Sequence, residues 1–291
     1  MKLFLKYFFI FWVIIFFAGG FFYVNKKHPV DIKSNSSITE TSVPIIAPEI
    51  PKEITYHSLV LATDKPLTEL TEAVGKENLP TVLGLNRIDK KFVRKGRTII
   101  IPDTFSDWMD YSPFPKQIES LQTISKIILV SQEIQAFGAY ENGILVRWGP
   151  VSTGKKSTPT PPGLYHTNWK GKSVTSTVDP TWIMPWYFNL QNIEGISMHQ
   201  YELPGYAASH SCVRMREEDE FFFYGWADQW KLSNDHQSVV ENGTPVIIFG
   251  EYNYNIKSPW KNLPTDKDAT TLTEEQINNE IAPYTEKLGI E

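Results

Sequence analysis

The sequence predicts a mainly β protein in which a small unit of two strands and two helices precedes a larger β-rich domain. An apolar N-terminal helix is expected before both. Three observations predict this: an uncharged segment at 7–24, a strand-helix-helix-strand pattern over 56–103, and short β-branched runs that recur between 125 and 250. Hydrophobic residues make up 41% of the 291 residues and aromatic residues 13%, which is enough for a sizeable core and excludes global disorder.

The N-terminal segment 7–24 contains eighteen consecutive apolar, small or otherwise uncharged residues, and it follows Lys2 and Lys6. As a helix it would be about 27 Å long, close to the thickness of a bilayer's hydrocarbon core. Further aromatic residues follow the small residues at 18–20, so we expect residues 1–24 to be an uncleaved single-pass anchor, with a cleaved signal segment as the alternative. Residues 25–55 contain proline, serine and threonine but no aromatic residue, which predicts a flexible linker.

Net charge and cysteine content exclude several classes of protein function. Lysine and arginine total 28 against 33 acidic residues, a net charge of -5, and the basic residues form no stripe. We therefore expect no binding to nucleic acid. Cys212 is the single cysteine, which excludes an intrachain disulfide and the multi-cysteine zinc patterns. No metal or other cofactor is expected.

The segment 56–103 has the pattern of a small βααβ unit. A strand is expected at 56–61, and a helix begins at Pro66 with aliphatic residues on one face and Gly75 as its C-terminal cap. A second short helix contains Pro80, and the β-branched run 98–102 predicts the closing strand.

The closing half of this unit, with Asn86, Gly96, Ile101 and Pro102, resembles a LysM domain. The resemblance covers residues 56–103. It implies binding to glycan that contains N-acetylglucosamine, especially peptidoglycan. A spacer without glycan affinity is the alternative.

The segment 125–250 is expected to be a β-rich domain, with strands at 126–131, 143–148 and 246–249. Between them, residues 152–163 carry three prolines and predict a loop with a rigid rim. In the tail 251–291, Thr273 and Gln276 form a capping-box pattern that predicts a short helix ending near Pro283. No function is assigned to this tail.

The chemistry is expected around Cys212, because His199 and His210 both lie within thirteen residues of it. A nucleophilic thiol needs an imidazole or another cationic neighbour to become thiolate at neutral pH. If residues 210–214 are extended, His210, Cys212 and Arg214 share a face. His199 is reached if the turn 203–205 folds the chain back. A buried, inert cysteine and a His-His-Cys metal site are the alternatives.

His199 and the run 209–214 (Ser-His-Ser-Cys-Val-Arg) resemble the YkuD-type L,D-transpeptidase catalytic domain. That family has a histidine, a short loop, and then Ser-His-Gly-Cys-aliphatic-Arg or Asn. Residues 184–187 (Met-Pro-Trp-Tyr) and the run 203–210 also correspond. Ser211 stands where the family usually has glycine, and Ala207 replaces a proline.

The resemblance implies roles for matching residues. Cys212 would be the nucleophile and His199 the general base, oriented by the backbone carbonyl of Gln200. The other implied site residues are the Ser211 and Cys212 backbone N–H groups as an oxyanion hole, His210 and Ser209 as groups that shape the site, Arg214 for a substrate carboxylate, and Trp186 and Tyr187, with Trp182, along the substrate groove. A packing role under the site is the alternative for these aromatic residues.

The function implied is that of a peptidoglycan L,D-transpeptidase. It transfers an acyl group through a cysteine thioester at the bond between a diamino acid and D-Ala in stem peptides, and so forms 3-3 cross-links or attaches proteins in cell wall biogenesis and cell shape. An L,D-carboxypeptidase, or a decayed membrane-tethered peptidoglycan-binding protein, is the alternative. The expected partners are stem peptides, glycan and the membrane. We expect an inner-membrane protein with its body in the periplasm, or a protein secreted to the envelope if the segment is cleaved.

Overall fold

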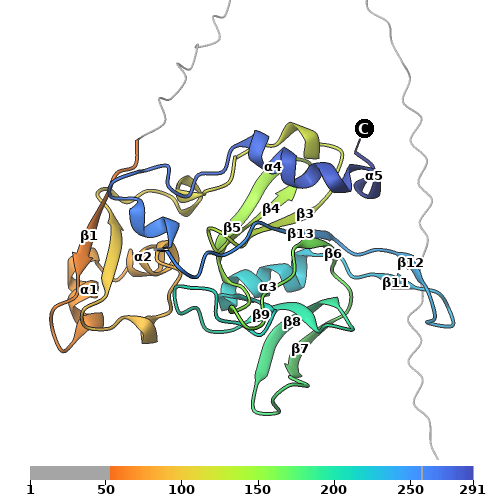
Figure 1. The fold of residues 1–291 in the computed structure, drawn as a ribbon, viewed down its shortest axis with the longest axis horizontal. Helices are drawn as coiled ribbons and strands as arrows, with labels where there is room; N and C mark the ends of the chain where they lie inside the picture. The colour runs from red at the N-terminus through yellow and green to blue at the C-terminus, as the bar shows by residue number, and fades with distance from the viewer. Residues whose placement is uncertain (1–52, 257, 291) are drawn as a thin grey trace, which may run out of the picture. The chain divides into compact units, whose positions relative to one another are not determined.

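The computed structural model describes residues 53–256 and 258–290 (Figure 1). The predicted membrane helix and nearly all of the predicted linker lie outside these residues. Within the described part, no helix has both the length and the apolar character needed to cross a bilayer. The helices are α1 (Pro66–Val74), α2 (Leu79–Leu85), α3 (Glu217–Trp226), α4 (Glu274–Ile281) and α5 (Thr285–Leu288). The strands are β1 (Tyr56–Val60), β2 (Thr98–Pro102), β3 (Ile127–Ser131), β4 (Ala136–Glu141), β5 (Ile144–Ser152), β6 (Gly163–His166), β7 (Lys170–Thr175), β8 (Ile183–Gln191), β9 (Ile196–Gln200), β10 (Val213–Met215), β11 (Lys231–Leu232), β12 (Val239–Glu241) and β13 (Pro245–Phe249).

Residues 56–103, which we call the small domain, have the predicted βααβ order. β1 and β2 pair antiparallel, and α1 ends at Gly75, whose φ of 82° requires the left-handed region. Asn86 joins the end of α2 to β2, because its side-chain amide donates to the Ile100 carbonyl at 2.7 Å and its side-chain oxygen accepts from the Ile100 N–H at 2.9 Å. Asn86 is itself buried, so this pair of hydrogen bonds replaces water that the site excludes.

Residues 125–250, which we call the large domain, are built on a nine-stranded sheet with the order β6-β13-β3-β4-β5-β10-β9-β8-β7. The β13–β3 and β10–β9 pairs are parallel, and the other pairs are antiparallel. β6 and β7 lie at opposite ends of this order, yet only residues 167–169 separate them in the chain. The sheet therefore curls until its two ends approach each other. The predicted β-rich fold is confirmed, although sequence patterns located only three of the strands.

Alternation along the central strands divides the apolar side chains between the two faces of the sheet. In β3, Ile128 and Val130 join a core inside the curl, together with Phe223 of α3. Ile127 and Leu129 point the other way and join a second core on the outer face. All five β3 residues are buried, as expected for a strand that is covered on both sides.

The outer core is closed by two segments that the sequence left outside both domains. Residues 104–124 contribute Phe114, Ile118 and Leu121 to it, and α4 of the C-terminal tail contributes Ile277 and Ile281. Figure 1 shows α4 lying beside β4 and β3. α4 begins with the predicted capping box, in which Thr273 and Gln276 exchange hydrogen bonds. The tail is therefore an integral part of the packed body, which the sequence did not predict.

Helix α3 was also missed by the sequence patterns, although its first turn is acidic as helix N-termini favour (Glu217, Glu218, Asp219 and Glu220). It packs on β8 and β9 beside the inner core. Asp219 is buried between Arg147 and Arg216, with N–O distances of 2.8 and 2.7 Å. Glu220 is fully buried, and its carboxyl oxygens lack a hydrogen-bond partner in the described part of the chain. Burial raises its pKa well above the ordinary value, since a desolvated site favours the neutral acid.

Candidate active site

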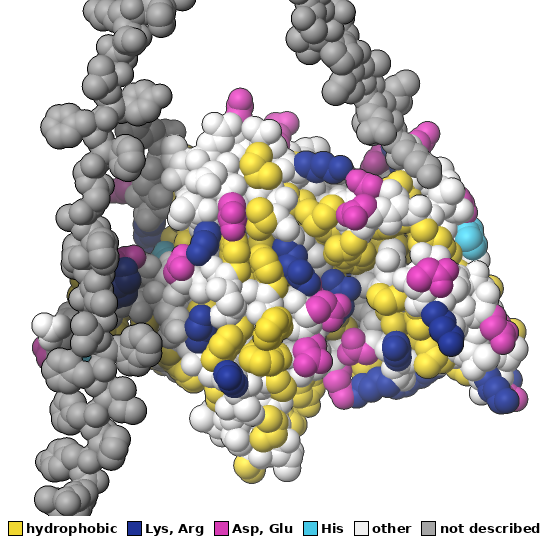
Figure 2. Space-filling model, turned by 180° about the vertical axis from the view of Figure 1, so that it is seen from behind, with side chains coloured by type: hydrophobic (Ala, Val, Ile, Leu, Met, Phe, Trp, Pro, Cys, Tyr) yellow, Lys and Arg dark blue, Asp and Glu magenta, His cyan; other side chains and the backbone are white. Residues whose placement is uncertain are grey.

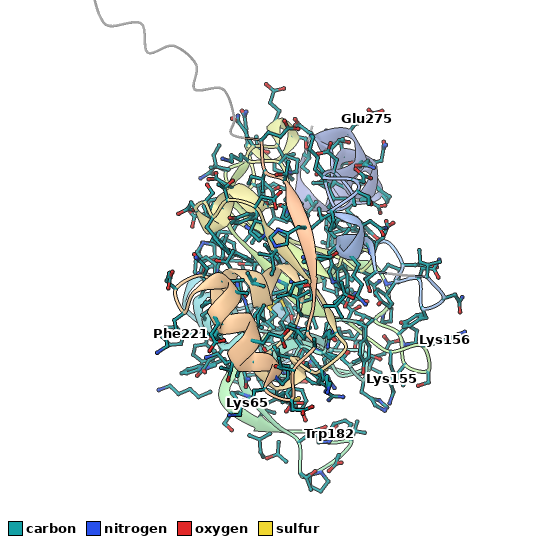
Figure 3. All side chains as sticks on the ribbon, turned by 90° about the vertical axis from the view of Figure 1, so that its left-hand side faces the viewer. Lys65, Lys155, Lys156, Trp182, Phe221 and Glu275 are labelled. Atoms are coloured by element: carbon teal, nitrogen blue, oxygen red, sulfur yellow. The ribbon has the colours of Figure 1, made fainter. Side chains whose placement is uncertain are left out.

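A cavity of about 370 Å³ opens between the β7–β8 hairpin and the strands β9 and β10. Figure 1 shows this hairpin projecting from the body, and Figure 3 places Trp182 on the projecting part. The predicted site residues that line the cavity are His199, Ser209, His210, Cys212, Arg214, Tyr187 and Trp182. The fold thus gathers most of the predicted site around one hollow.

The parallel pairing of β9 with β10 brings the histidine and cysteine regions together. Its register sets Arg214 opposite His199, and Cys212 immediately precedes β10. Two adjacent parallel strands require a crossover connection, which brings the chain back to the end of the sheet where the first strand began. Residues 201–212, here called the crossover loop, make that connection, and Gly205 turns within it at φ 88°. The predicted reversal at 203–205 is therefore present.

His199 is buried, with 5% of its surface exposed. Its Nδ1 lies 3.0 Å from the backbone carbonyl of Gln200. Because a carbonyl only accepts, Nδ1 carries the proton and Nε2 keeps a free lone pair. Burial lowers the pKa of His199 to about 4, although the Gln200 carbonyl raises it; the charge of Arg214 lowers it further. The imidazole is therefore neutral at pH 7 and can accept a proton.

Cys212 is partly buried. The Ser197 hydroxyl donates to its Sγ at 3.2 Å, and Sγ lies 3.5 Å from the Gly195 carbonyl. Burial raises the pKa of the thiol, while hydrogen bonds from Ser197 and the charge of Arg214 lower it. The sequence led us to expect a thiolate beside a cation. Instead, the site holds a neutral thiol near a neutral imidazole, because both groups are desolvated.

Ser211 adopts a φ of 77°, the left-handed conformation in which glycine is favoured. The segment 210–212 is bent and β10 begins only at Val213, so the extended geometry considered for 210–214 is not the one observed. His210, Cys212 and Arg214 nevertheless line the same cavity. Among the described residues, the backbone N–H groups of Ser211 and Cys212 donate to no protein acceptor. They are therefore available to an oxygen of a bound molecule.

Among the described residues that line the cavity, Arg214 is the one lysine or arginine. Its guanidinium lies over the Tyr201 ring, 4.6 Å from the centroid. Tyr201 also contacts His199 edge-to-face, with the ring centroids 5.8 Å apart. Tyr201 thus spaces the arginine and the imidazole, and Arg214 is placed to meet a negative charge on a molecule in the cavity.

The predicted groove aromatics separate into two groups. Tyr187 lines the cavity and lies nearly parallel to His199, with ring centroids 6.4 Å apart. Trp186 does not line the cavity: its φ is 52°, and it packs against Phe221 and Tyr224 of α3 at centroid distances of 5.0 and 5.4 Å. The packing alternative therefore describes Trp186. Trp182 lines the cavity, with its ring 5.8 Å from that of His210.

The proline-rich loop 152–163 contacts the cysteine segment directly. The Thr160 hydroxyl donates to the Ser211 carbonyl at 2.9 Å, and the Lys155 N–H donates to the Ser209 carbonyl at 2.9 Å. Ser209 is buried, and its hydroxyl donates to the Cys212 carbonyl. This loop, predicted to form a rigid rim, thus supports the turn in which Ser211 is strained.

Two residues beside the thiol, Ser197 and Gly195, escaped the sequence analysis. Ser197 precedes His199 by two residues on β9, so both side chains share a face of the strand. That spacing is visible in the sequence, but the relevance of Ser197 depends on the pairing of β9 with β10.

His166 and His236 do not line the cavity. His166 ends β6 and is half-buried, and His236 lies in an exposed turn. In the described part of the chain, no group of three His, Cys, Asp or Glu residues is arranged to hold a metal ion. Figure 2 shows acidic and basic side chains interspersed with hydrophobic ones on the face it presents.

Several solved structures resemble this chain at low identity. An L,D-transpeptidase from Stackebrandtia nassauensis is 21% identical with a TM-score of 0.36, over 45% of this chain and 58% of that one. One from Mycobacterium smegmatis is 18% identical with a TM-score of 0.35, over 43% and 59%. One from Enterococcus faecium is 20% identical with a TM-score of 0.34, over 43% and 50%. The chain thus spans between half and three fifths of these structures.

No curated protein matches the chain. A family model does match: that of the L,D-transpeptidase catalytic domain, YkuD, over residues 125–248. This segment contains β3 to β12, most of β13, and every residue that lines the cavity. The match confirms that residues 125–248 resemble the YkuD-type L,D-transpeptidase catalytic domain, as the motif around Cys212 predicted.

Proposed function

We propose that this protein is a peptidoglycan L,D-transpeptidase that transfers an acyl group through a thioester on Cys212. The observation that carries the proposal is the pairing, in one cavity, of a thiol with a neutral imidazole whose Nδ1 donates to a backbone carbonyl. A histidine fixed in this tautomer presents Nε2 as a base, and a cysteine whose thiol is deprotonated is a strong nucleophile.

In the first half-reaction, the Cys212 sulfur attacks the carbonyl between the diamino acid at the third stem position and the terminal D-Ala. His199 takes the thiol proton and returns it to the nitrogen of the departing D-Ala. The carbon–nitrogen bond breaks, and a thioester remains on Cys212. In the second half-reaction an amine attacks the thioester, His199 accepts the amine proton, and that proton restores the thiol.

The neutral resting pair is compatible with this reaction because charge develops only as the bond forms. The oxyanion of the tetrahedral intermediate would be met by the backbone N–H groups of Ser211 and Cys212. Arg214 would stabilise a carboxylate of the donor substrate, and His210 and Ser209 would shape the site around it. The charge of Arg214 also favours the developing thiolate.

The acceptor decides the product. A stem-peptide amine gives a 3-3 cross-link, a protein lysine gives an attached protein, and water makes the enzyme an L,D-carboxypeptidase. Trp182 and Tyr187 line the cavity and offer apolar surface to either substrate.

We further propose that the small domain acts as a LysM-like glycan-binding domain, supported by its βααβ order and by Asn86 at the end of α2. The apolar segment 7–24 would anchor the protein in the inner membrane, with the body in the periplasm. A segment that is cleaved would release the body into the envelope.

One observation favours a second candidate, a wall-binding protein whose catalytic domain has decayed. Ser211 is strained at φ 77°, where the family usually has glycine. Such a protein would bind sacculi equally well with or without the thiol.

Intact-mass analysis after exposure to a carbapenem separates the two candidates. The wild type is expected to gain one adduct, and Cys212→Ala is expected to gain none. His199→Ala is expected to slow the reaction far more than His210→Ala. A wild-type protein that stays unmodified would refute the enzyme. Muropeptide analysis of sacculi incubated with the protein then identifies the acceptor, because the three acceptors give different products.

A further inference from the structure

The crossover loop (residues 201–212) is the covalent link between His199 and Cys212. Its conformation contributes to the spacing between the base and the nucleophile, because β9 and β10 fix only the residues on either side. A misplacement of about 1 Å between reacting groups costs an enzyme about a hundredfold in rate. The contacts that hold this loop therefore affect the rate of the reaction at Cys212.

The second half of the loop is held by the large domain. The Ser152 hydroxyl of β5 donates to the Tyr206 carbonyl at 2.8 Å and accepts from the Ala208 N–H at 3.1 Å. The Ser209 N–H donates to the Thr153 carbonyl at 2.9 Å. Residues 206–209 are thus tied to the strand that also pairs with β10.

Residues 202–204 of the loop are held by the small domain, whereas the Tyr201 N–H before them donates to the Met215 carbonyl of β10 at 3.1 Å. The Asp89 N–H donates to the Leu203 carbonyl at 2.9 Å, and the Leu203 N–H donates to Asp89 Oδ2 at 2.8 Å. Arg97 Nη2 donates to the Pro204 carbonyl at 2.8 Å. Among the described residues, the partners of residues 202–204 in hydrogen bonds and ion pairs all belong to the small domain, including Lys91, which pairs with Glu202.

The fit at Gly205 shows how closely the two domains approach. A Cβ atom there would stand 2.3 Å from Arg97 Nη2 and 2.8 Å from Ile88 Cγ2. Gly205 also adopts a φ of 88°, which side-chain-bearing residues avoid. Arg97 is fixed in turn, since its Nη1 donates to the Phe92 carbonyl at 3.0 Å. The contact is a built, well-packed junction in which one arginine joins two backbone segments.

We propose that the small domain completes the active site: Asp89 and Arg97 are positioning residues that hold residues 203–204 and thereby contribute to the spacing between His199 and Cys212 that the pairing of β9 with β10 establishes. This inference rests on the proposed function and assigns the small domain a catalytic part besides glycan binding. Neither residue touches the substrate, so both act through the loop.

The test compares paired variants of the full-length chain in the rate of Cys212 acylation by a carbapenem, followed by intact mass. Asp89→Ala removes the acceptor of the Leu203 N–H, whereas Asp89→Asn keeps a side-chain oxygen in its place. We expect Asp89→Ala to slow acylation at least about tenfold and Asp89→Asn to stay within about twofold of the wild type. Arg97→Ala is expected to slow acylation similarly, and Arg97→Lys, which keeps a single donor, to fall between Arg97→Ala and the wild type.

Asp103→Ala is the matched control, because Asp103 is an exposed aspartate of the same domain. Its hydrogen bonds to described residues are with the Thr55 and His57 side chains and the Thr55 carbonyl, and none reaches the crossover loop. It should acylate at the wild-type rate. Thermal melts identify any variant that does not fold, and the rescue by asparagine distinguishes positioning from general destabilisation. If the wild type is acylated and Asp89→Ala reacts as fast, the inference is wrong and the proposed function stands. If the wild type is not acylated, the proposed function itself fails.

Discussion

The two halves of the curled sheet differ in how regular their backbone is and in how far their side chains are buried. Strands β13, β3, β4 and β5 are largely buried, and their positive-φ residues outside glycine, Gln135 and Asn142, lie in turns between strands. Strands β10, β9, β8 and β7 border an open cavity, and this half holds Trp186 and Ser211 at positive φ. The regular half stabilises the fold. The irregular half contains features that cost stability and serve the site: a strained turn, a buried imidazole and a thiol.

This contrast predicts that substitutions in the regular half change stability far more than they change chemistry. Trp148 of β5 is fully buried and stacks on Trp108 with centroids 4.1 Å apart. Each indole N–H donates to the other residue's carbonyl, at 3.0 and 2.9 Å. We expect Trp148→Ala to lower the free energy of unfolding by about 3–5 kcal/mol, measured by denaturant unfolding. Acylation of the folded fraction should stay near the wild-type rate.

Ile144→Ala on the same strand is the control for Trp148→Ala. Ile144 is 47% exposed, so its truncation should cost less than about 1 kcal/mol. Equal losses of unfolding free energy in the two variants would contradict the claim that β5 stabilises the protein through its buried side chains.

In the irregular half, His199 predicts a pH dependence of stability. Its pKa is about 4 in the folded protein, below the ordinary value, because the site is desolvated. The unfolded chain therefore binds a proton first as pH falls below about 6.5, and the folded state loses stability between about pH 6.5 and 4. This loss should amount to about 3 kcal/mol and be absent from His199→Gln.

The measurement is denaturant unfolding of both proteins at pH 7 and pH 4. Asp219 and Glu220 act in the opposite direction, since their raised pKa values favour the folded state as pH falls. They are present in both proteins, so the difference between wild type and His199→Gln isolates the imidazole. Parallel pH curves for the two proteins would show that His199 is not held neutral by burial.

The smallest effect is expected at Ser211. Glycine adopts a φ of 77° without the steric cost that a side chain incurs, so Ser211→Gly should raise stability by about 1 kcal/mol or less. In a melt this corresponds to a rise in Tm of at most about 2–4 °C. Acylation should be no slower than in the wild type.

Ser209→Gly gives the contrasting control for Ser211, because its hydroxyl donates to the Cys212 carbonyl and its φ is not positive. It should lower the Tm. A Ser211→Gly variant that melts earlier than the wild type would mean that the serine hydroxyl stabilises the turn by more than the backbone strain costs.

Local patterns in the sequence located the elements whose signals are themselves local. The glycine at 75 that caps α1 and the Thr273–Gln276 capping box that starts α4 are short-range devices, and both were predicted. Helix α3 was missed because its acidic first turn is followed by an aromatic run without a clear apolar stripe. The strands β4, β6, β7 and β9 to β12 were missed because two to six residues carry little periodicity. The nine-residue β8 was missed because its residues 184–187 were interpreted as a motif of the site.

By itself, the sequence determined the mainly β fold, the βααβ order of the small domain, and the residues of the cysteine motif, because propensity, period and motif spacing are properties of neighbouring residues. Only the tertiary structure decided that Ser197 donates to the thiol and that Trp186 faces α3. It also decided that the tail closes the outer core and that Asp89 and Arg97 form hydrogen bonds with the crossover loop. The contacts of Asp89 and Arg97 join residues 114 and 107 positions apart. No local pattern encodes such a pairing, since it exists only once the sheet has curled and the two domains have packed.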